Sequence, residues 1–179
     1  MRPDYDVVIA GFGPTGAMAA NLLAQHNIKT LVVDPQTEIY DIPRGVHFDG
    51  ETMRIFQSIG IADAVMAQSA SNETVEFVNG RGASLMLAAL DEVVETAGWP
   101  TDIFFRQPLV EKTLRDNLAG CEAIDCQLGW QLEALKQEDT QVTMTLRCTE
   151  TDATQTITAA YLIGADGADS AVRRLADIA

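Results

Sequence analysis

Long apolar runs are missing from this chain of 179 residues. No segment approaches the ~20 apolar residues that a membrane-spanning helix needs. The amino-terminal stretch MRPDYDVVIAGFG also lacks the apolar region and the small-residue cleavage site of a signal peptide. We therefore expect no membrane partner, and we predict a cytoplasmic protein.

Basic residues are scarce, because 12 lysines and arginines stand against 26 aspartates and glutamates and give a formal net charge of −14. A surface of this sign repels phosphate backbones and anionic membrane surfaces. The sequence therefore predicts no nucleic-acid partner.

Ligands for a metal are few as well. The chain has three cysteines without CxxC spacing and two histidines, a pattern that argues for free thiols and against a zinc site or a disulfide framework. His47, Asp49 and Glu51 stand close together in the sequence and raise a metal hypothesis. The group contains one histidine and no further ligand type nearby. The start of a helix, where acidic residues interact favourably with the helix dipole, explains it better than a metal site, so we expect no metal.

A strand–helix–strand pattern opens the chain. Residues Asp6–Ala10 form a compact β-branched run, Pro14–His26 are rich in helix formers with proline at the start, and Thr30–Asp34 are again short and apolar. Such a βαβ unit predicts a parallel sheet with a right-handed crossover. The fold class is therefore α/β.

Further elements are predicted in the remaining chain. DGETMRIFQSIG indicates a helix capped by Asp49 and ended by Gly60, TVEFVNGRGASLML indicates a hairpin, and RQPLVEKTLRDNLAG is an amphipathic helix that ends at Gly120. From Trp130 onward the apolar residues alternate. This predicts an antiparallel three-stranded meander that leads into a buried strand, Tyr161–Ala165.

The glycine motif between the first strand and the first helix carries the strongest chemical signal. Gly11, Gly13 and Gly16 form GxGxxG, in which the first glycine permits a tight turn, the second lets a pyrophosphate approach the backbone, and the third lets helix and strand pack closely. Asp34 ends the second strand, where an acid can accept hydrogen bonds from an adenosine ribose. The motif predicts an adenine dinucleotide site in preference to a structural glycine turn, but it does not choose between FAD and NAD.

Other segments make that choice. DIPRGVHFDGETMRIFQSIGI, FFRQPLVEKTLRDNL and YLIGADGADSAVRR follow the βαβ unit in this order. Together they resemble the flavoprotein aromatic hydroxylases, the FAD-dependent monooxygenases that include para-hydroxybenzoate hydroxylase. The similarity is closest to the 3-(3-hydroxyphenyl)propionate hydroxylase branch, and it extends over essentially the whole chain.

The resemblance implies roles for particular residues. It places the FAD pyrophosphate at the glycine motif, at Gly11, Gly13, Pro14, Thr15 and Gly16. Asp34 would bind the ribose, Arg44 would lie along the flavin side, Gln107 would contact FAD, and Asp166 would belong to the family's Asp-Gly motif, which is tied to the cofactor and to NAD(P)H use. Each also has a structural alternative: a surface ion pair for Arg44, a helix cap for Gln107 and a plain turn for Asp166. The family usually has alanine where Gly45 stands.

The resemblance also implies an activity. NAD(P)H, a co-substrate, would reduce FAD, a flavin C4a-hydroperoxide would form with O₂, and a phenolic or other small aromatic substrate would be hydroxylated. We assign no catalytic residue. An NAD-dependent Rossmann dehydrogenase is the weaker alternative, because it would leave Arg44, Gln107 and the Asp-Gly motif unexplained.

The same resemblance predicts the organisation of the chain. We expect a Rossmann-like FAD-binding domain over residues 1–179, with residues 61–104 contributing in part to a substrate-domain region. The family's second flavin motif, Gly-Asp, does not follow, so we expect an amino-terminal portion that is truncated relative to the family. A complementing chain or a homo-oligomer would complete it. The alternative hypothesis is a non-catalytic dinucleotide-binding or interaction module.

Overall fold

The computed structural model describes residues 2–71, 73–90 and 98–178. It divides into two compact units, which are described separately. The first unit comprises Met1–Asp41 and Leu114–Ala179, and the second comprises Ile42–Thr113. No helix among the described residues is long and apolar enough to cross a membrane.

The first unit is built on a six-stranded mixed sheet with the strand order β8-β2-β1-β11-β10-β9. The strands β8, β2, β1 and β11 run parallel to one another, whereas β10 is antiparallel to both β11 and β9. The elements of this unit are β1 (Tyr5–Ala10), α1 (Pro14–Gln25), β2 (Thr30–Asp34), β8 (Ile124–Leu128), β9 (Trp130–Gln137), β10 (Val142–Cys148), β11 (Thr154–Gly164) and α5 (Ala171–Leu175).

The βαβ unit predicted at the amino terminus is confirmed. The strand β1 pairs in parallel with β2, and α1, which connects the two strands, begins at Pro14 and packs against both. Ile9 and Val32 are fully buried on the face of the sheet that α1 covers, while Val8 and Leu31 face the meander core. The sheet is therefore covered on both faces at β1 and β2, which explains their uninterrupted apolar sequences.

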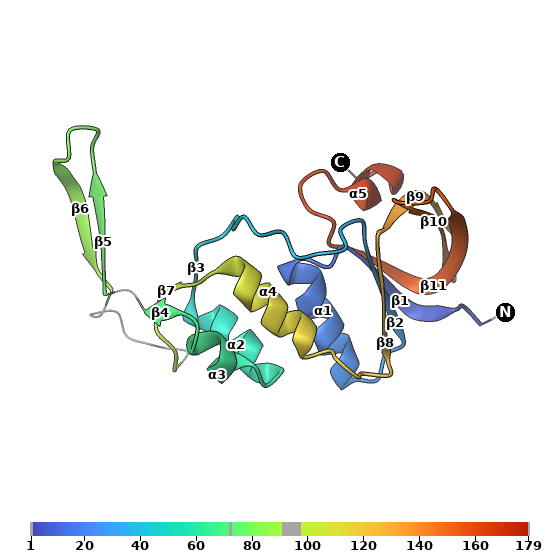
Figure 1. Cartoon of the computed structure of the whole chain (residues 1–179), viewed down its shortest axis with the longest axis horizontal. Helices are drawn as coiled ribbons and strands as arrows, with labels where there is room; N and C mark the ends of the chain where they lie inside the picture. The colour runs from blue at the N-terminus through green and yellow to red at the C-terminus, as the bar shows by residue number, and fades with distance from the viewer. Residues whose placement is uncertain (1, 72, 91–97, 179) are drawn as a thin grey trace. The chain divides into compact units, whose positions relative to one another are not determined.

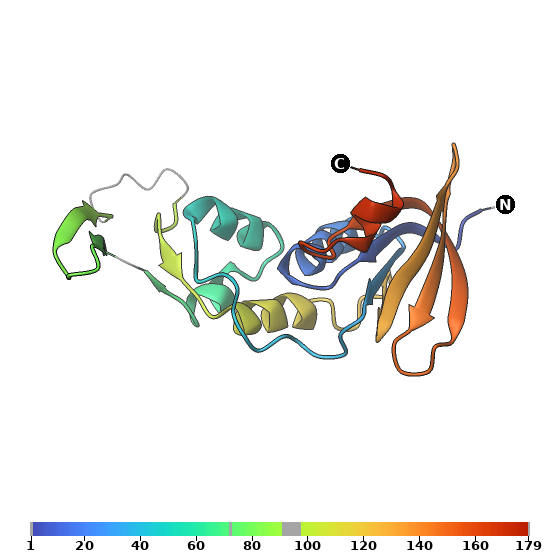
Figure 2. The same ribbon diagram turned by 90° about the horizontal axis from the view of Figure 1, so that it is seen from above.

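The meander of β9, β10 and β11 curls away from the parallel strands (Figure 1), and α5 lies next to β9. Figure 2 shows the same unit from above, with α1 in blue and the meander strands in orange. The alternating residues Val142, Met144 and Leu146 are buried, as the period of two predicts. They form one core with Val8 and Leu31.

Two features of the first unit differ from the sequence prediction. The strand predicted to be buried at Tyr161–Ala165 is the end of the long strand β11, in which Ala159 alone is buried and Tyr161 is 71% exposed. The prediction was wrong because an apolar sequence is buried only where another element covers it: Leu162 packs against the core and Val172 of α5 lies beside Gly164, but the face that carries Tyr161 stays exposed. The parallel edge strand β8 was not predicted: IDCQL alternates apolar and polar residues, but the segment is only five residues long and contains no apolar run.

The second unit contains short elements. Asp49 caps its helix α2 as predicted, with the carboxylate accepting hydrogen bonds from the backbone N–H and the hydroxyl of Thr52. Gly60 follows the helix with a positive φ of 80°. The elements are β3 (His47–Phe48), α2 (Gly50–Ser58), α3 (Ala62–Met66), β4 (Ala70–Ser71), β5 (Thr74–Val78), β6 (Ser84–Ala89), β7 (Ile103–Phe104) and α4 (Gln107–Asp116), of which α4 continues into the first unit.

The predicted hairpin is present as the two-stranded sheet β5–β6, drawn in green in Figure 1. Its apolar side chains are exposed to water on both faces, including Phe77, Leu85 and Leu87 at 52%, 69% and 65%. A two-stranded hairpin is marginally stable at best in water without further packing. The hairpin therefore presents apolar surface that the described residues leave uncovered.

Candidate dinucleotide-binding site

The glycine loop between β1 and α1 has the geometry that the motif predicts. Gly11 adopts a φ of +104°, and a Cβ at this position would collide with the carbonyl oxygen of Ala165 on the chain that leaves β11. A Cβ at Gly16 would collide with the carbonyl oxygen of Gly11. These two glycines therefore let loop, helix and neighbouring strand approach closely.

Gly13 is different, because a Cβ there would meet no atom within 4 Å. It precedes the twelve-residue helix α1, whose amino terminus has no side-chain cap and no acidic residue in its first turn. The amide N–H groups of a helix start and the helix dipole attract phosphate oxygens. Open space in front of such a helix end suits a pyrophosphate.

The backbone N–H and the backbone carbonyl of Phe12 both form hydrogen bonds to side chains. Its N–H donates a hydrogen bond to Oδ2 of Asp34 at 2.7 Å, and its carbonyl oxygen accepts one from Nη2 of Arg115 at 2.8 Å. The Arg115 guanidinium also lies 4.4 Å from the centre of the Phe12 ring. The carboxylate of Asp34 additionally accepts from the N–H of Gln36 at 2.8 Å. Asp34 thus has a structural role in shaping the loop that the sequence did not predict, and its contact with a ribose stays a prediction.

Asp166 lies beside the glycine loop, because β11 and β1 are parallel neighbours and the N–H of Ala165 donates to the carbonyl of Ala10 at 2.7 Å. Its carboxylate accepts hydrogen bonds from the N–H groups of Ala171 and Val172 at 2.6 and 3.0 Å and from the Ser170 hydroxyl at 2.5 Å. The Asp-Gly turn is therefore tied to the start of α5.

A cavity of 210 Å³ adjoins these two motifs. Gly11 and Asp166 line it together with Trp130 and Arg174. The structure thus brings the glycine loop, Asp34 and Asp166 to the carboxyl ends of the parallel strands, where ligands bind in open α/β sheets.

Arg44 and Gln107 are brought together in the second unit. The side-chain oxygen of Gln107 accepts hydrogen bonds from the backbone N–H groups of Arg44 and Gly45, at 2.8 and 3.0 Å. Gln107 is 7% exposed. It therefore fixes the backbone on which the Arg44 side chain is carried, a role that neither the cofactor hypothesis nor the helix-cap hypothesis had named.

The residues of the metal hypothesis have other contacts. Asp49 caps α2, and Nδ1 of His47 lies 3.0 Å from the carboxylate of Asp102. Among the described residues, no group of three or more histidines, cysteines and acids is placed to hold a metal ion.

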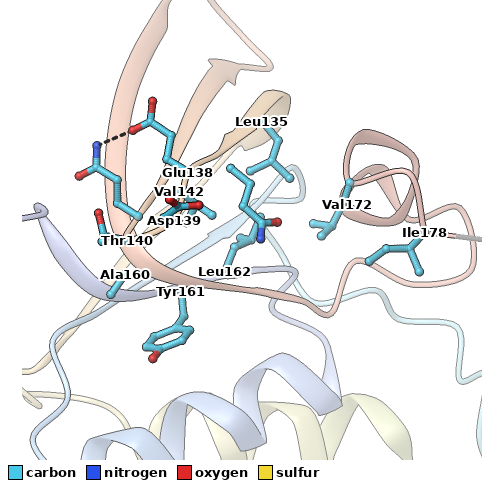
Figure 3. A pocket seen from close by; sticks show the side chains of 13 residues that line it. Leu135, Glu138, Asp139, Thr140, Val142, Ala160, Tyr161, Leu162, Val172 and Ile178 are labelled. Atoms are coloured by element: carbon cyan, nitrogen blue, oxygen red, sulfur yellow. Dashed lines mark hydrogen bonds between the residues drawn. The ribbon is translucent and has the colours of Figure 1, made fainter.

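A larger cavity of 540 Å³ lies elsewhere in the first unit (Figure 3). Apolar side chains from β9, β10, β11 and α5, among them Leu135, Val142, Leu162 and Val172, line it next to the turn at Glu138 and Asp139. None of the predicted cofactor residues lines this cavity.

Sequence reasoning missed Arg115 and the buried Asn21. Nδ2 of Asn21 donates to the carbonyl of Leu114 at 2.9 Å, which attaches the end of α4 to α1. Burial raises the pKa of the Cys126 thiol, and the charge of Arg115 opposes this rise. The amphipathic pattern predicted the helix that carries Arg115, but no signal in a single sequence connects Arg115 to a loop 103 residues away.

Known proteins share this sequence pattern. Residues 4–179 match the family described as the FAD binding domain. A 3-(3-hydroxy-phenyl)propionate/3-hydroxycinnamic acid hydroxylase 1 from Burkholderia vietnamiensis (strain G4 / LMG 22486) is 36% identical over 182 residues, which cover 98% of this chain and 28% of the relative. The chain thus spans less than a third of the length of this curated relative.

Solved structures give the same fold. The flavin-dependent monooxygenase PieE in complex with FAD and substrate is similar at a TM-score of 0.87 and 27% identity, over 99% of this chain and 33% of that one. The p-nitrophenol 4-monooxygenase PnpA from Pseudomonas putida DLL-E4 has a TM-score of 0.90 over 98% of this chain and 44% of its own, at 20% identity, which shows the fold alone. The resemblance found in the motifs is confirmed.

Proposed function

Because the chain belongs to the FAD binding domain family, we propose that it is the FAD-binding part of an FAD-dependent monooxygenase that hydroxylates a small aromatic substrate, with NAD(P)H and O₂ as co-substrates. The single observation that carries the proposal is the glycine loop. Open space at Gly13 lies in front of an uncapped helix start, between two glycines that tolerate no side chain. This is the arrangement that a pyrophosphate requires.

The residues of the chain bind and orient the cofactor in this proposal. The N–H groups at the start of α1, around Gly13, Thr15 and Gly16, donate to the pyrophosphate. The Asp34 carboxylate oxygens, which also accept hydrogen bonds from the backbone N–H groups of Phe12 and Gln36, accept hydrogen bonds from the adenosine ribose. Asp166 keeps the turn at the start of α5 in place beside the cofactor, and Gln107 and Arg44 act along its flavin side.

FAD, when bound, supplies the electron transfer from NAD(P)H and the activation of O₂, which the side chains of the protein cannot provide. The substrate class is proposed from the relative at 36% identity, whose name specifies a hydroxylated phenylpropionate and a hydroxycinnamic acid. We extend the proposal to the organisation of the chain: residues 61–104 contribute to a substrate-domain region. The exposed apolar side chains of β5 and β6 support this, because they need a cover in the whole protein.

The proposal is tested by adding FAD to the purified chain, separating it by gel filtration, and recording the flavin absorbance of the protein peak. Flavin should elute with the wild-type protein. Gly13→Val should abolish this, since the valine side chain enters the space in front of α1, where an added Cβ meets no protein atom within 4 Å. Gly80→Val is the matched control, because a Cβ there also meets nothing within 4 Å but lies in the hairpin turn.

Retention of FAD by Gly13→Val, at an affinity equal to that of wild type and Gly80→Val, would contradict the site. A wild-type chain that elutes without flavin at saturating FAD would contradict binding by this chain. ADP should compete with FAD for the site, because it carries the pyrophosphate and ribose that the loop and Asp34 contact.

A further inference from the structure

We propose that Arg115 is a positioning residue for FAD binding: it fixes the Phe12–Gly13 peptide so that the amide groups at the start of α1 face the pyrophosphate. The inference rests on the proposed function, since it concerns the same loop. It adds a residue that lies outside every motif that identifies the site.

Two contacts connect Arg115 to the loop. Its Nη2 donates a hydrogen bond to the Phe12 carbonyl at 2.8 Å, and its guanidinium lies 4.4 Å from the centre of the Phe12 ring. The Phe12 side chain is only 4% exposed, so this cation–π contact is shielded from water. Shielded contacts of both kinds are stronger than exposed ones.

The hydrogen bond determines the direction of an amide group. A peptide unit is planar and trans, so its C=O and N–H point in opposite directions. Because the Phe12 carbonyl points to Arg115, the N–H of Gly13 in the same peptide points away from Arg115. The preceding peptide is fixed too, since the Phe12 N–H donates to Asp34 at 2.7 Å. Asp34 and Arg115 therefore hold successive peptides of the loop.

Arg115 is itself held in place by a buried network. Asn21 on α1 is 3% exposed, and its Nδ2 donates to the carbonyls of Ala17 and Leu114 at 2.8 and 2.9 Å. Its Oδ1 accepts from Nδ2 of Asn117 at 2.8 Å. Leu114 and Asn117, which flank Arg115, are thus attached to the helix whose first turn follows the loop, so the backbone that carries the guanidinium is held near Phe12.

Charge adds to this geometry. The chain has a formal net charge of −14, yet the ligand of the loop carries a negatively charged pyrophosphate. A guanidinium beneath the loop lowers the electrostatic cost of bringing that anion to the protein. Lysine would keep this charge but lose the planar group that stacks on Phe12.

The experiment measures the dissociation constants of ADP and FAD for the full chain and for Arg115→Met and Arg115→Lys, together with urea unfolding of each. Arg115→Met should weaken ADP binding by about 10- to 100-fold, the range for loss of a hydrogen bond to a charged group. Arg115→Lys should recover part of this loss. Arg147→Met is the matched control: Arg147 pairs with Glu133 and Asp152 on the meander, and its loss should change ADP binding less than twofold.

A second measurement follows the NMR hydrogen exchange of the Phe12 amide without ligand, because its hydrogen bond to Asp34 protects it. Exchange should be faster in Arg115→Lys than in wild type, since a loop that is held less firmly opens this bond more often, and this keeps the test valid if the methionine variant does not fold. ADP affinity within twofold of wild type in a folded Arg115→Met, or unchanged Phe12 exchange in Arg115→Lys, overturns the positioning role while the proposed function stands. A wild-type chain that binds neither ADP nor FAD overturns both.

Discussion

In the first unit the central strands β1 and β2 are buried on both faces, whereas in the second unit the hairpin β5–β6 is exposed on both. The compositions of these strands are similar, since all four are rich in β-branched or other apolar residues. The difference lies in what covers them. Helix α1 and the meander core enclose β1 and β2, and no described element covers the hairpin.

The same contrast in burial distinguishes the surroundings of the glycine loop from those of the hairpin. The glycine loop follows β1, so its position is set by a strand with almost no freedom to move. The apolar residues of the hairpin are exposed and therefore stabilise little within the described residues. Substitutions in the buried strands and around the glycine loop are therefore expected to change stability more than substitutions in the exposed hairpin.

The largest effect is expected from Gly16→Val. A Cβ at Gly16 would collide with the Gly11 carbonyl, so the helix must move away from the strand, at a cost of about 4 kcal/mol in the free energy of unfolding. Urea unfolding measures this loss. Gly13→Val, two residues from Gly11 in the same loop, should unfold at nearly the wild-type urea concentration, and equal destabilisation by both variants would contradict the described loop.

The next largest effect is the difference in unfolding free energy between a side-chain truncation in the core and one in the hairpin. Ile9→Ala removes a fully buried side chain between α1 and the sheet and should cost about 3 kcal/mol. Leu85→Ala removes a side chain that is 69% exposed and should change the free energy of unfolding by less than about 0.5 kcal/mol. A cost for Leu85→Ala comparable to that for Ile9→Ala would show that the hairpin is packed in this chain.

A smaller effect concerns the helix cap in the second unit. Asp49→Ala should lower the free energy of unfolding by about 1 kcal/mol, the usual value of an N-cap. The hydrogen bonds from the Thr52 backbone N–H and then from the Thr52 hydroxyl hold the pKa of Asp49 below its usual range. The contribution of the carboxylate charge is therefore complete above the ordinary aspartate pKa and is lost as the pH falls through the lowered value.

Circular dichroism during thermal unfolding at several pH values measures this effect. Asp49→Asn is the control, because it keeps a side-chain acceptor but cannot titrate. A stability difference between the wild type and the Asp49→Asn variant that stays constant from neutral to acidic pH would contradict the assignment.

The smallest effect, of opposite sign, is expected for Gly45→Ala. A Cβ there would lie 3.4 Å from Cζ of Phe105, an ordinary contact. The change should stabilise the protein by about 0.4–1 kcal/mol by restricting the unfolded chain. Gly82→Ala should destabilise instead, because Gly82 has a φ of +78°. Destabilisation by Gly45→Ala in thermal unfolding would mean that the backbone near Gln107 tolerates no side chain.

Local patterns predicted much of this fold. The βαβ unit, the Asp49 cap and the hairpin depend on neighbouring residues, and the sequence located them to within a residue or two. The burial of Tyr161 was predicted wrongly because it depends on a covering element and not on the strand itself. The strand β8 was missed because its parallel pairing with β2 is a long-range contact that a five-residue segment does not reveal.

The same distinction applies to the site. GxGxxG could be found from the sequence itself, because the strand and the helix around it are predictable, whereas Asp166 was singled out by its resemblance to a family motif. The bond of Gln107 to the backbone of Arg44 spans 63 residues, and that of Arg115 to Phe12 spans 103. Contacts of this kind depend on how separate elements pack, so a single sequence does not specify them.

Hydrogen–deuterium exchange of the chain with and without FAD tests the central claim most directly, because it compares the two regions in one experiment. FAD should slow exchange in residues 11–17 and in the turn around Asp166 and Gly167, and it should leave the amides of β5 and β6 unchanged. Protection of the hairpin with none in residues 11–17, or FAD binding without any protection of the glycine loop, would contradict the account.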